Sequence, residues 1–316
     1  MADDFLHNHK EFSDLIRIVG EEQAISPVLV EKDYWIMHCL YGLQRLGMKF
    51  ELKGGTSLSK GFGIIDRFSE DIDIRIEPPK GMDVETNPNK TKPAHVASRK
   101  SFYDHLVDKI EIDGIESVER DTEFDDANYR SAGIRLRYKS RTGTLQGLKD
   151  GILLEVGFDD VAPNLPKVIS SWAYDYASPK VTVIDNRAID VACYHPGYTF
   201  VEKLQTISTK YRKQQIDGEF PANFMRHYYD VFQLLQEPLV RNFIGTPDYI
   251  AHKGRRFRRE DNPVLAENEA FLLSSPEIKK TFASAYAGSE ALYYKAQPSF
   301  EDILAAFAEA IKFKGI

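Results

Sequence analysis

The sequence has little cysteine and no long apolar run. Its 316 residues include two cysteines, Cys39 and Cys193, which lie far apart and form no C-x-x-C pair. We therefore expect neither a disulfide framework nor a thiolate metal site, and this cysteine usage suits a reducing cytoplasm. The N-terminus is acidic and no apolar stretch follows it, so the sequence indicates neither a signal peptide nor a membrane span. We expect a cytoplasmic protein.

The sequence also lacks a surplus of positive charge. Lys and Arg total 41 against 48 Asp and Glu, which gives a net charge of −7 and a pI of about 5.7. This balance indicates no general affinity for nucleic acid, so any polynucleotide partner would need a local basic patch. Hydrophobic residues make up 42% and charged residues 28% of the chain, an ordinary globular composition with room for one large domain or two smaller ones.

Two short motifs lie close together in the first quarter of the chain. Gly54-Gly55-Thr56-Ser57 is a small-residue turn that opens a predicted short helix, and Asp71-Ile72-Asp73 places two carboxylates around one apolar residue. Apolar residues alternate on both sides of this stretch, at Phe50 and Leu52 and again at Ile72, Ile74 and Ile76. The pattern predicts a strand, a Gly-Gly turn, a short helix and a second strand.

The carboxylate pair favours a divalent cation. Residues i and i+2 of a strand share one face about 7 Å apart, so Asp71 and Asp73 would project together while Ile72 and Ile74 enter the core. Two like charges this close repel, and a hard cation such as Mg²⁺ relieves the repulsion. The glycine turn allows close backbone approach, and free N–H groups at a helix N-terminus suit a phosphate. Together the motifs predict nucleotide chemistry, although either motif alone is more often a solvated surface feature.

Gly54 to Ser57, followed by Arg67-Phe68-Ser69-Glu70-Asp71-Ile72-Asp73, resembles the AbiEii/AbiGii family of nucleotidyltransferase toxins, within the DNA polymerase β-like nucleotidyltransferase superfamily. The resemblance implies that Gly54, Gly55, Thr56 and Ser57 cradle the phosphates of an NTP. It implies that Asp71 and Asp73 bind Mg²⁺ or Mn²⁺. It also implies a toxin half of a toxin–antitoxin or phage-defence pair, with a cognate antitoxin encoded nearby and the 3′ end of tRNA as acceptor.

A third carboxylate, Glu155, interrupts the apolar run from Gly151 to Phe158. Such a run predicts a strand buried on both faces, and a buried carboxylate there needs a partner. In the family that the chain resembles, a neighbouring strand supplies a third metal ligand, and Glu155 matches it by position. Asp159 and Asp160 are the competing candidates, but they follow the run and are interpreted as turn residues.

The second half of the chain carries two further blocks that resemble the family, Glu202-Lys203-Leu204 and Arg226-His227-Tyr228-Tyr229-Asp230-Val231. The resemblance implies that Lys203 binds the triphosphate and that Asp230 is a catalytic-site residue, which orients Lys203 or the attacking group. If the resemblance is set aside, the pattern indicates only that Lys203 extends to solvent and that Arg226 forms a surface ion pair with Asp230 one helical turn away. His227 is assigned a structural role, because polymerase-like chemistry requires no base there.

Two charged stretches have open interpretations. The helix predicted from Pro27 to about Leu46 contains Glu31-Lys32-Asp33, which also resembles the family, and Lys32 or Asp33 could reach the active site. We favour the other interpretation, an amphipathic helix with these charges exposed. The stretch from His252 to Arg259 is predicted to be a loop and holds Lys253, Arg255, Arg256, Arg258 and Arg259. It is the best candidate for RNA binding, with Phe257 available to stack on a base, but a solvated loop that balances neighbouring acids explains it nearly as well.

We expect an α+β fold. Residues 1–190 would form a nucleotidyltransferase domain with a mixed β-sheet flanked by helices, and residues 191–316 a mainly helical domain that completes the nucleotide cleft. Strands are expected at 131–138, 151–158 and 180–184, and helices at 95–110, 199–215, 222–236 and 299–314.

The function expected is Mg²⁺-dependent transfer of NMP from an NTP to RNA. Transfer to a protein side chain (AMPylation) and a non-enzymatic NTP-binding module are the alternatives. Ser69 lies two residues before Asp71, so a phosphate on Ser69 would repel the triphosphate and could act as an off-switch.

Overall fold

The computed structural model describes residues 4–145, 148–221, 223–288 and 293–314. By its internal contacts the chain divides into two compact units. The sheet unit consists of Met1–Phe62 and Phe68–Tyr194, and the helical unit of Gly63–Arg67 and His195–Ile316. The chain therefore leaves the sheet unit after Phe62, returns to it at Phe68 and leaves it again after Tyr194.

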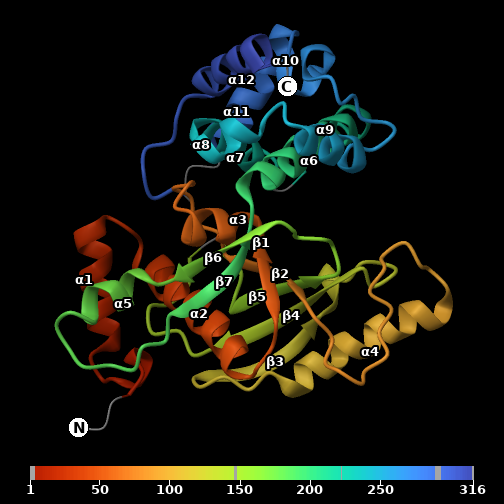
Figure 1. Ribbon diagram of the computed structural model, residues 1–316. Helices are drawn as coiled ribbons and strands as arrows, with labels where there is room; N and C mark the ends of the chain where they lie inside the picture. Colours follow the sequence, from red (N-terminus) through yellow and green to blue (C-terminus); the bar gives the residue numbers. More distant parts are fainter. Residues whose placement is uncertain (1–3, 146–147, 222, 289–292, 315–316) are drawn as a thin grey trace. The chain divides into compact units, whose positions relative to one another are not determined.

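The sheet unit is a mixed β-sheet with helices before and between its strands (Figure 1). The strands are β1 (Phe50–Lys53), β2 (Asp71–Ile76), β3 (Ile115–Asp121), β4 (Ser131–Tyr138), β5 (Ile152–Gly157), β6 (Asn164–Ile169) and β7 (Ala188–Tyr194). The helices are η1 (Leu6–Asn8), α1 (Phe12–Gln23), α2 (Pro27–Arg45), α3 (Gly54–Thr56), the π-helical turn η2 (Ser57–Gly61), α4 (Pro93–Lys109), η3 (Thr122–Phe124) and α5 (Trp172–Ala177). The predicted order of strand, Gly-Gly turn, short helix and strand is confirmed.

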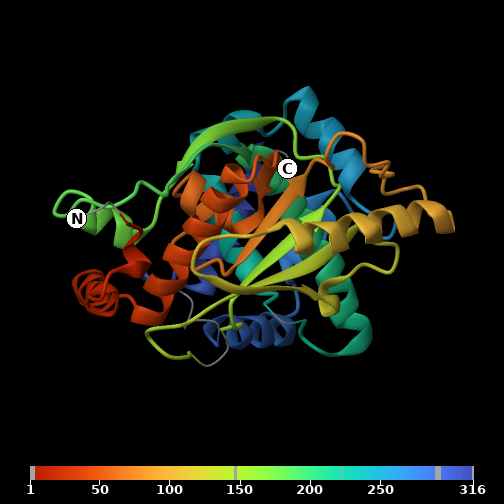
Figure 2. The same ribbon diagram turned by 90° about the horizontal axis from the view of Figure 1, so that it is seen from below.

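Within the described residues the seven strands form one sheet in the order β3-β4-β5-β2-β1-β7-β6. β2 pairs in parallel with β5, and β1 with β7, while the other neighbours are antiparallel. This mixed sheet with flanking helices confirms the predicted α+β class. Since successive residues point to opposite faces, Ile72, Ile74, Leu154 and Ile134 share one face, where all are fully buried. Figure 2 shows α2 and α4 lying across the sheet on one side.

The charged residues of α2 are buried, so the expectation of an exposed charged face was wrong. Glu31, Lys32 and Asp33 are each 1% exposed. Glu31 accepts hydrogen bonds from the backbone N–H of Arg141, and Asp33 forms an ion pair with Lys60, 2.8 Å between Nζ and Oδ1. Each charge is compensated by a partner from a distant loop or turn, which makes its burial possible.

The helical unit is built around the long helix α6. Its helices are α6 (Pro196–Asp217), α7 (Arg226–Gln236), α8 (Pro238–Phe243), α9 (Pro247–Arg256), η4 (Leu265–Glu267), α10 (Glu269–Leu272), α11 (Pro276–Ala287) and α12 (Phe300–Lys314). α6 begins with Pro196 at its first position and ends at Gly218, whose φ of 76° is the left-handed conformation that commonly closes a helix. α7, α8, α9 and α10 all pack against α6, and α12 packs against α7.

The segment Gly63–Arg67 belongs to the helical unit although it lies between β1 and β2 in the sequence. Its backbone is held by two tyrosines. The Asp66 N–H donates to the hydroxyl of Tyr229, and the hydroxyl of Tyr294 donates to the carbonyl of Ile65, both at 2.9 Å. The segment is thus fixed by side chains from α7 and from the chain before α12.

Three predicted elements need correction. No strand occurs at 180–184, because the chain there is irregular until β7 begins at Ala188, and β6 was not predicted. The basic stretch is not a loop at its start, since α9 continues to Arg256, with its N-terminus capped by Thr246. The helix predicted from residue 222 begins at Arg226, and residue 222 lies outside the described residues. None of the helices in the described ranges is long and apolar enough to cross a membrane.

Candidate active site

The register of the sheet puts the three predicted carboxylates on one face. Asp73 is the Cα partner of Glu155 across the parallel pair of β2 and β5, and Asp71 lies opposite Leu153. Partners across a sheet point to the same side, and Asp71 and Asp73 are two residues apart. All three side chains therefore project from the same face of the sheet, and the buried isoleucines project from the other face. Asp71 is buried, while Asp73 and Glu155 are half-buried. The predicted alternation of β2 is confirmed.

Gly54 lies directly against Asp73. A Cβ on Gly54 would stand 2.0 Å from Oδ2 of Asp73, and the φ of Gly54 is +71°. Only glycine fits such a position, both because of the space and because of the backbone angle. The glycine turn therefore lies against Asp73, the second carboxylate of the pair.

Thr56 has a structural role beside any role in ligand binding. Its side chain is fully buried and its hydroxyl donates to the carbonyl of Asp71 at 2.5 Å. This bond fixes the start of β2 to the helical turn after the glycines. Gly55 and Ser57 are also buried, so Gly54 is the most accessible residue of the four.

Asp71 lies beside an ammonium group that pattern analysis did not single out. Lys149 Nζ is 3.2 Å from both carboxylate oxygens of Asp71. Burial raises the pKa of Asp71, the positive charge of Lys149 opposes that effect, and the nearby charges of Glu70 and Asp73 add to it. Lys149 lies in the loop between β4 and β5, where no motif marks it.

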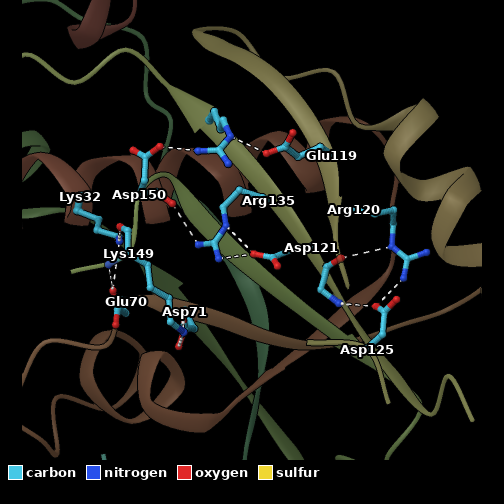
Figure 3. Close-up of polar contacts among 12 residues, drawn as sticks. Lys32, Glu70, Asp71, Glu119, Arg120, Asp121, Asp125, Arg135, Lys149 and Asp150 are labelled. Carbon is cyan, nitrogen blue, oxygen red and sulfur yellow. Dashed lines mark hydrogen bonds and ion pairs between the residues drawn. The ribbon is translucent and has the colours of Figure 1, made fainter. Parts of the chain in front are cut away.

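A buried charge network supports this part of the site (Figure 3). Lys32 Nζ donates to Oε2 of Glu70 at 3.3 Å and to the carbonyl of Lys149 at 2.5 Å, while the Lys149 N–H donates to the same Oε2 at 2.9 Å. Lys32 and Glu70 are 1% and 7% exposed. Lys32 of α2 thus holds both Glu70, which precedes Asp71 in the sequence, and Lys149, which contacts Asp71.

The donor set suits a hard divalent cation, because three carboxylates project from one face and offer only oxygen ligands. The side chains are not gathered around a single point, however. Within the described residues, no group of three His, Cys, Asp or Glu side chains is arranged to hold a metal ion. At Asp71 the ammonium of Lys149 is the cation that both oxygens contact.

Lys203 and Asp230 come together in the helical unit, and Arg67 joins them. Arg67 donates from Nε to Oδ1 and from Nη2 to Oδ2 of Asp230, both at 2.7 Å, and Lys203 Nζ is 2.9 Å from Oδ2. Burial alone would raise the pKa of Asp230, but the charges of Arg67 and Lys203 outweigh it and hold the pKa below its usual range. Arg67 belongs to the motif that resembles the family, but its partner could not be deduced from the sequence.

More positive charge surrounds this trio. Burial, together with the charges of Arg226 and Lys203, lowers the pKa of Lys210 to about 8. His227 is 8% exposed, and neither of its ring nitrogens has a hydrogen-bond partner within the described residues. Burial and the neighbouring cations lower the pKa of His227 well below its usual value, so the imidazole is neutral.

The predicted RNA-binding residues lie on and after α9. Arg255, Arg258 and Arg259 are exposed, whereas Arg256 forms an ion pair with Glu202, 3.2 Å between Nη2 and Oε1. Lys253 is half-buried over the ring of Tyr249. Arg255, Arg258 and Arg259 are therefore accessible to anions from solvent.

Ser69 is half-buried, next to the buried Phe68 and Glu70.

The glycine turn, the carboxylate face and the Lys203–Asp230 pair agree with the match of this chain to a family of nucleotidyltransferase toxins. The model of the family described as "Nucleotidyl transferase AbiEii toxin, Type IV TA system" matches residues 38–306, and the chain belongs to this family. It is a nucleotidyltransferase, and the type IV toxin–antitoxin family implies an antitoxin partner and an NTP substrate. The family predicted from the two motifs is confirmed.

Among solved structures, the chain is similar to MenT4, a nucleotidyltransferase toxin from Mycobacterium tuberculosis H37Rv. The identity is 15% and the TM-score 0.51, over 94% of this chain and 95% of that one. This likeness supports the fold. An antigenic nucleotidyltransferase-like protein from Paracoccidioides brasiliensis matches at 12% identity and a TM-score of 0.35, over 72% of this chain and 94% of that one. No curated protein sequence matches significantly.

Proposed function

We propose that this nucleotidyltransferase moves NMP from an NTP to the 3′ end of tRNA in a reaction that depends on Mg²⁺ or Mn²⁺. The observation that carries the proposal is the alignment of Asp71, Asp73 and Glu155 on one face of the sheet, with the backbone of Gly54 against Asp73. Such a modification of tRNA would block translation, so the toxin would act in the cytoplasm as part of a toxin–antitoxin or phage-defence system.

Asp71, Asp73 and Glu155 are the residues that would hold the metal. When bound, a divalent ion lowers the pKa of the acceptor hydroxyl and stabilises the negative charge of the leaving pyrophosphate. Because Gly54 has no side chain, its backbone lies directly against Asp73, beside the proposed metal ligands, and this is where a phosphate of the NTP is proposed to bind. Gly55, Thr56 and Ser57 complete the turn that shapes this approach.

Lys203 is proposed as the triphosphate ligand of the helical unit. Its ammonium is held by Asp230, which Arg67 also contacts. A single carboxylate shared by two cations leaves net positive charge, and Lys210 and Arg226 add to it. Asp230 is therefore proposed to orient Lys203, and the surplus of positive charge favours a polyphosphate.

RNA is favoured over protein as the acceptor because Arg255, Arg258 and Arg259 are exposed in an otherwise acidic chain. Lys253 and Arg256 would contribute less, since each has contacts within the helical unit. Neutralising the three exposed arginines should weaken tRNA binding and flatten its dependence on salt, and it should spare a protein acceptor.

Ser69 is proposed as a regulatory position. A phosphate there would place about two negative charges two residues before Asp71 and disturb both metal and triphosphate binding. Ser69→Asp should lower transfer strongly, whereas the neutral Ser69→Asn, of similar size, should retain most of it. Full activity of Ser69→Asp would argue against this role.

The decisive experiment incubates the protein with each α-³²P-labelled NTP, Mg²⁺ and total bacterial tRNA, beside an Asp71→Ala/Asp73→Ala variant. Label on tRNA only with the unaltered protein would support the proposal and identify the nucleotide. Label on protein would instead favour the AMPylation-type alternative. NTP binding without transfer to either acceptor would remove the support for tRNA and favour a binding module.

A further inference from the structure

The position of Lys149 is set by its backbone. Its N–H donates to Glu70 Oε2 at 2.9 Å, and its carbonyl accepts from Lys32 Nζ at 2.5 Å. Both partners are buried and bonded to each other, so this end of the loop between β4 and β5 is anchored to α2 and to the start of β2. Figure 3 shows the Lys149 side chain extending from this anchor to Asp71.

The ammonium of Lys149 lies where a cation would bind to Asp71. It is 3.2 Å from Oδ1 and 3.2 Å from Oδ2, and it also lies 4.6 Å from the centre of the Phe124 ring. A Mg²⁺ ion binds carboxylate oxygens at about 2.0–2.1 Å. An ion on these oxygens would stand next to the ammonium, and the two positive charges would repel, so one must leave for the other to bind closely.

We propose that Lys149 is a resident counter-cation of Asp71, which a divalent metal ion displaces when it binds to the carboxylate face. Lys149 is then a positioning residue that balances the charge of Asp71 and sets the affinity for metal. The side chain can withdraw because it is 30% exposed and has four flexible methylene groups, while its backbone stays anchored. This inference rests on the proposed function insofar as Asp71 is a metal ligand.

The test measures Mn²⁺ binding to the full-length protein at pH 7.5 without NTP, by the loss of the free-Mn²⁺ electron paramagnetic resonance signal. Lys149→Met keeps the length and the backbone anchor of the side chain but removes its charge. We expect Lys149→Met to bind Mn²⁺ about tenfold more tightly than the unaltered protein, since the ion no longer competes with an ammonium. Asp71→Asn should abolish this binding.

Lys53→Met is the matched control. Lys53 is the Cα partner of Asp73 and lies on the same face, but its ammonium pairs with Asp159 at 3.6 Å. The Lys53→Met variant loses one positive charge from the same face but no contact to Asp71. We therefore expect the Mn²⁺ affinity of this variant to change by no more than about twofold. Lys149→Arg, which keeps the charge, should behave like the unaltered protein.

Each other outcome overturns the inference. Equal affinity in Lys149→Met and the unaltered protein would show that there is no competition, and weaker affinity would show that Lys149 supports the metal. An equal gain in Mn²⁺ affinity in Lys53→Met would show that the gain comes from the net charge of the face and not from the contact between Lys149 and Asp71. These results would not contradict the proposal of nucleotidyl transfer, whereas absence of Mn²⁺ binding in every form would overturn the metal dependence of the proposed function as well.

Discussion

Arg67 and Asp230, which lie 163 positions apart in the sequence, form a buried, bidentate ion pair with both N–O distances at 2.7 Å. Arg67 is 2% exposed and Asp230 is fully buried. The pair fixes Gly63–Arg67 to α7, and Lys203 on α6 reaches the same carboxylate. One carboxylate thus organises three separate parts of the helical unit.

Arg67→Met should destabilise the protein strongly. It removes both guanidinium hydrogen bonds to the buried Asp230 and, within the described residues, leaves that carboxylate only the single contact with Lys203, and loss of a partner from a buried pair costs about 3–5 kcal/mol. Urea denaturation would measure this loss. Lys295→Met is the control, because Lys295 pairs with Asp66 of the same segment at 2.8 Å but is 69% exposed, and its pair should contribute at most about 1 kcal/mol. Similar losses for both variants would contradict this account.

Gly54→Ala should abolish nucleotidyl transfer. Its new methyl group would lie 2.0 Å from Oδ2 of Asp73 and would push that carboxylate from its place. Gly63→Ala provides the comparison, since Gly63 has a similar φ of +65° but nothing within 4 Å of the added carbon. It should lose only about 1–2 kcal/mol of stability for the left-handed backbone and keep its activity. Activity assays and thermal melting of the two variants separate the clash from the backbone strain.

Lys203→Met should weaken the use of NTP without unfolding the protein. Asp230 keeps its two bonds to Arg67, so the core of the cluster remains, but the ammonium proposed for the triphosphate is gone. We expect kcat/KM for the NTP to fall on the order of a hundredfold. Lys213→Met, an exposed change on the same helix, should leave kcat/KM unchanged. An unaffected kcat/KM in Lys203→Met would remove Lys203 from the site.

Acid should destabilise the sheet unit through His38. Its Nδ1 accepts from Asn186 and its Nε2 donates to the carbonyl of Asp113, so the buried ring is held neutral. Burial, with the nearby His7, lowers the pKa of His38 from 6.5 to about 4. Below pH 6.5 the unfolded chain therefore binds a proton that the folded chain does not, and the free energy of unfolding falls as the pH drops from 6.5 towards 4.

The full loss across this interval is about 3 kcal/mol, from a shift of roughly 2.5 units at 1.36 kcal/mol each. Denaturation at pH 7 and pH 5 would measure a little over half of it, about 2 kcal/mol. His38→Gln, which can both donate and accept, should reduce the difference between the two pH values. The same pH dependence in His38→Gln and the unaltered protein would assign the acid sensitivity to other groups.

The carboxylate face could be predicted from the sequence because it depends on a local rule. Alternation with a period of two places Asp71 and Asp73 together whatever the rest of the chain does, and Glu155 is conspicuous in an apolar run. The register that sets Glu155 beside Asp73 is a property of the folded sheet, but the apolar residues around both carboxylates leave few other arrangements.

Contacts between distant segments could not be predicted. Lys32 looks like an exposed helical charge until Glu70 and the Lys149 carbonyl are known, and these lie 38 and 117 positions away. Lys149 follows no motif, and its chemistry arises only from the loop that brings it to Asp71. The same holds for Arg67, since nothing in its own neighbourhood indicates a buried carboxylate on α7.

The excursion of Gly63–Arg67 limits how the protein can be divided for expression. A fragment that ends at Tyr194 would contain the seven strands of the sheet but would carry Arg67 without Asp230. Its segment Gly63–Arg67 would also lack the hydrogen bonds to Tyr229 and Tyr294. A fragment that begins at His195 would hold Asp230 and Lys203 without the guanidinium of Arg67, which donates to both oxygens of Asp230. Split halves should therefore be recovered better by coexpression than separately, and a shortened version of the sheet fragment would need residues 63–67 replaced by a polar linker.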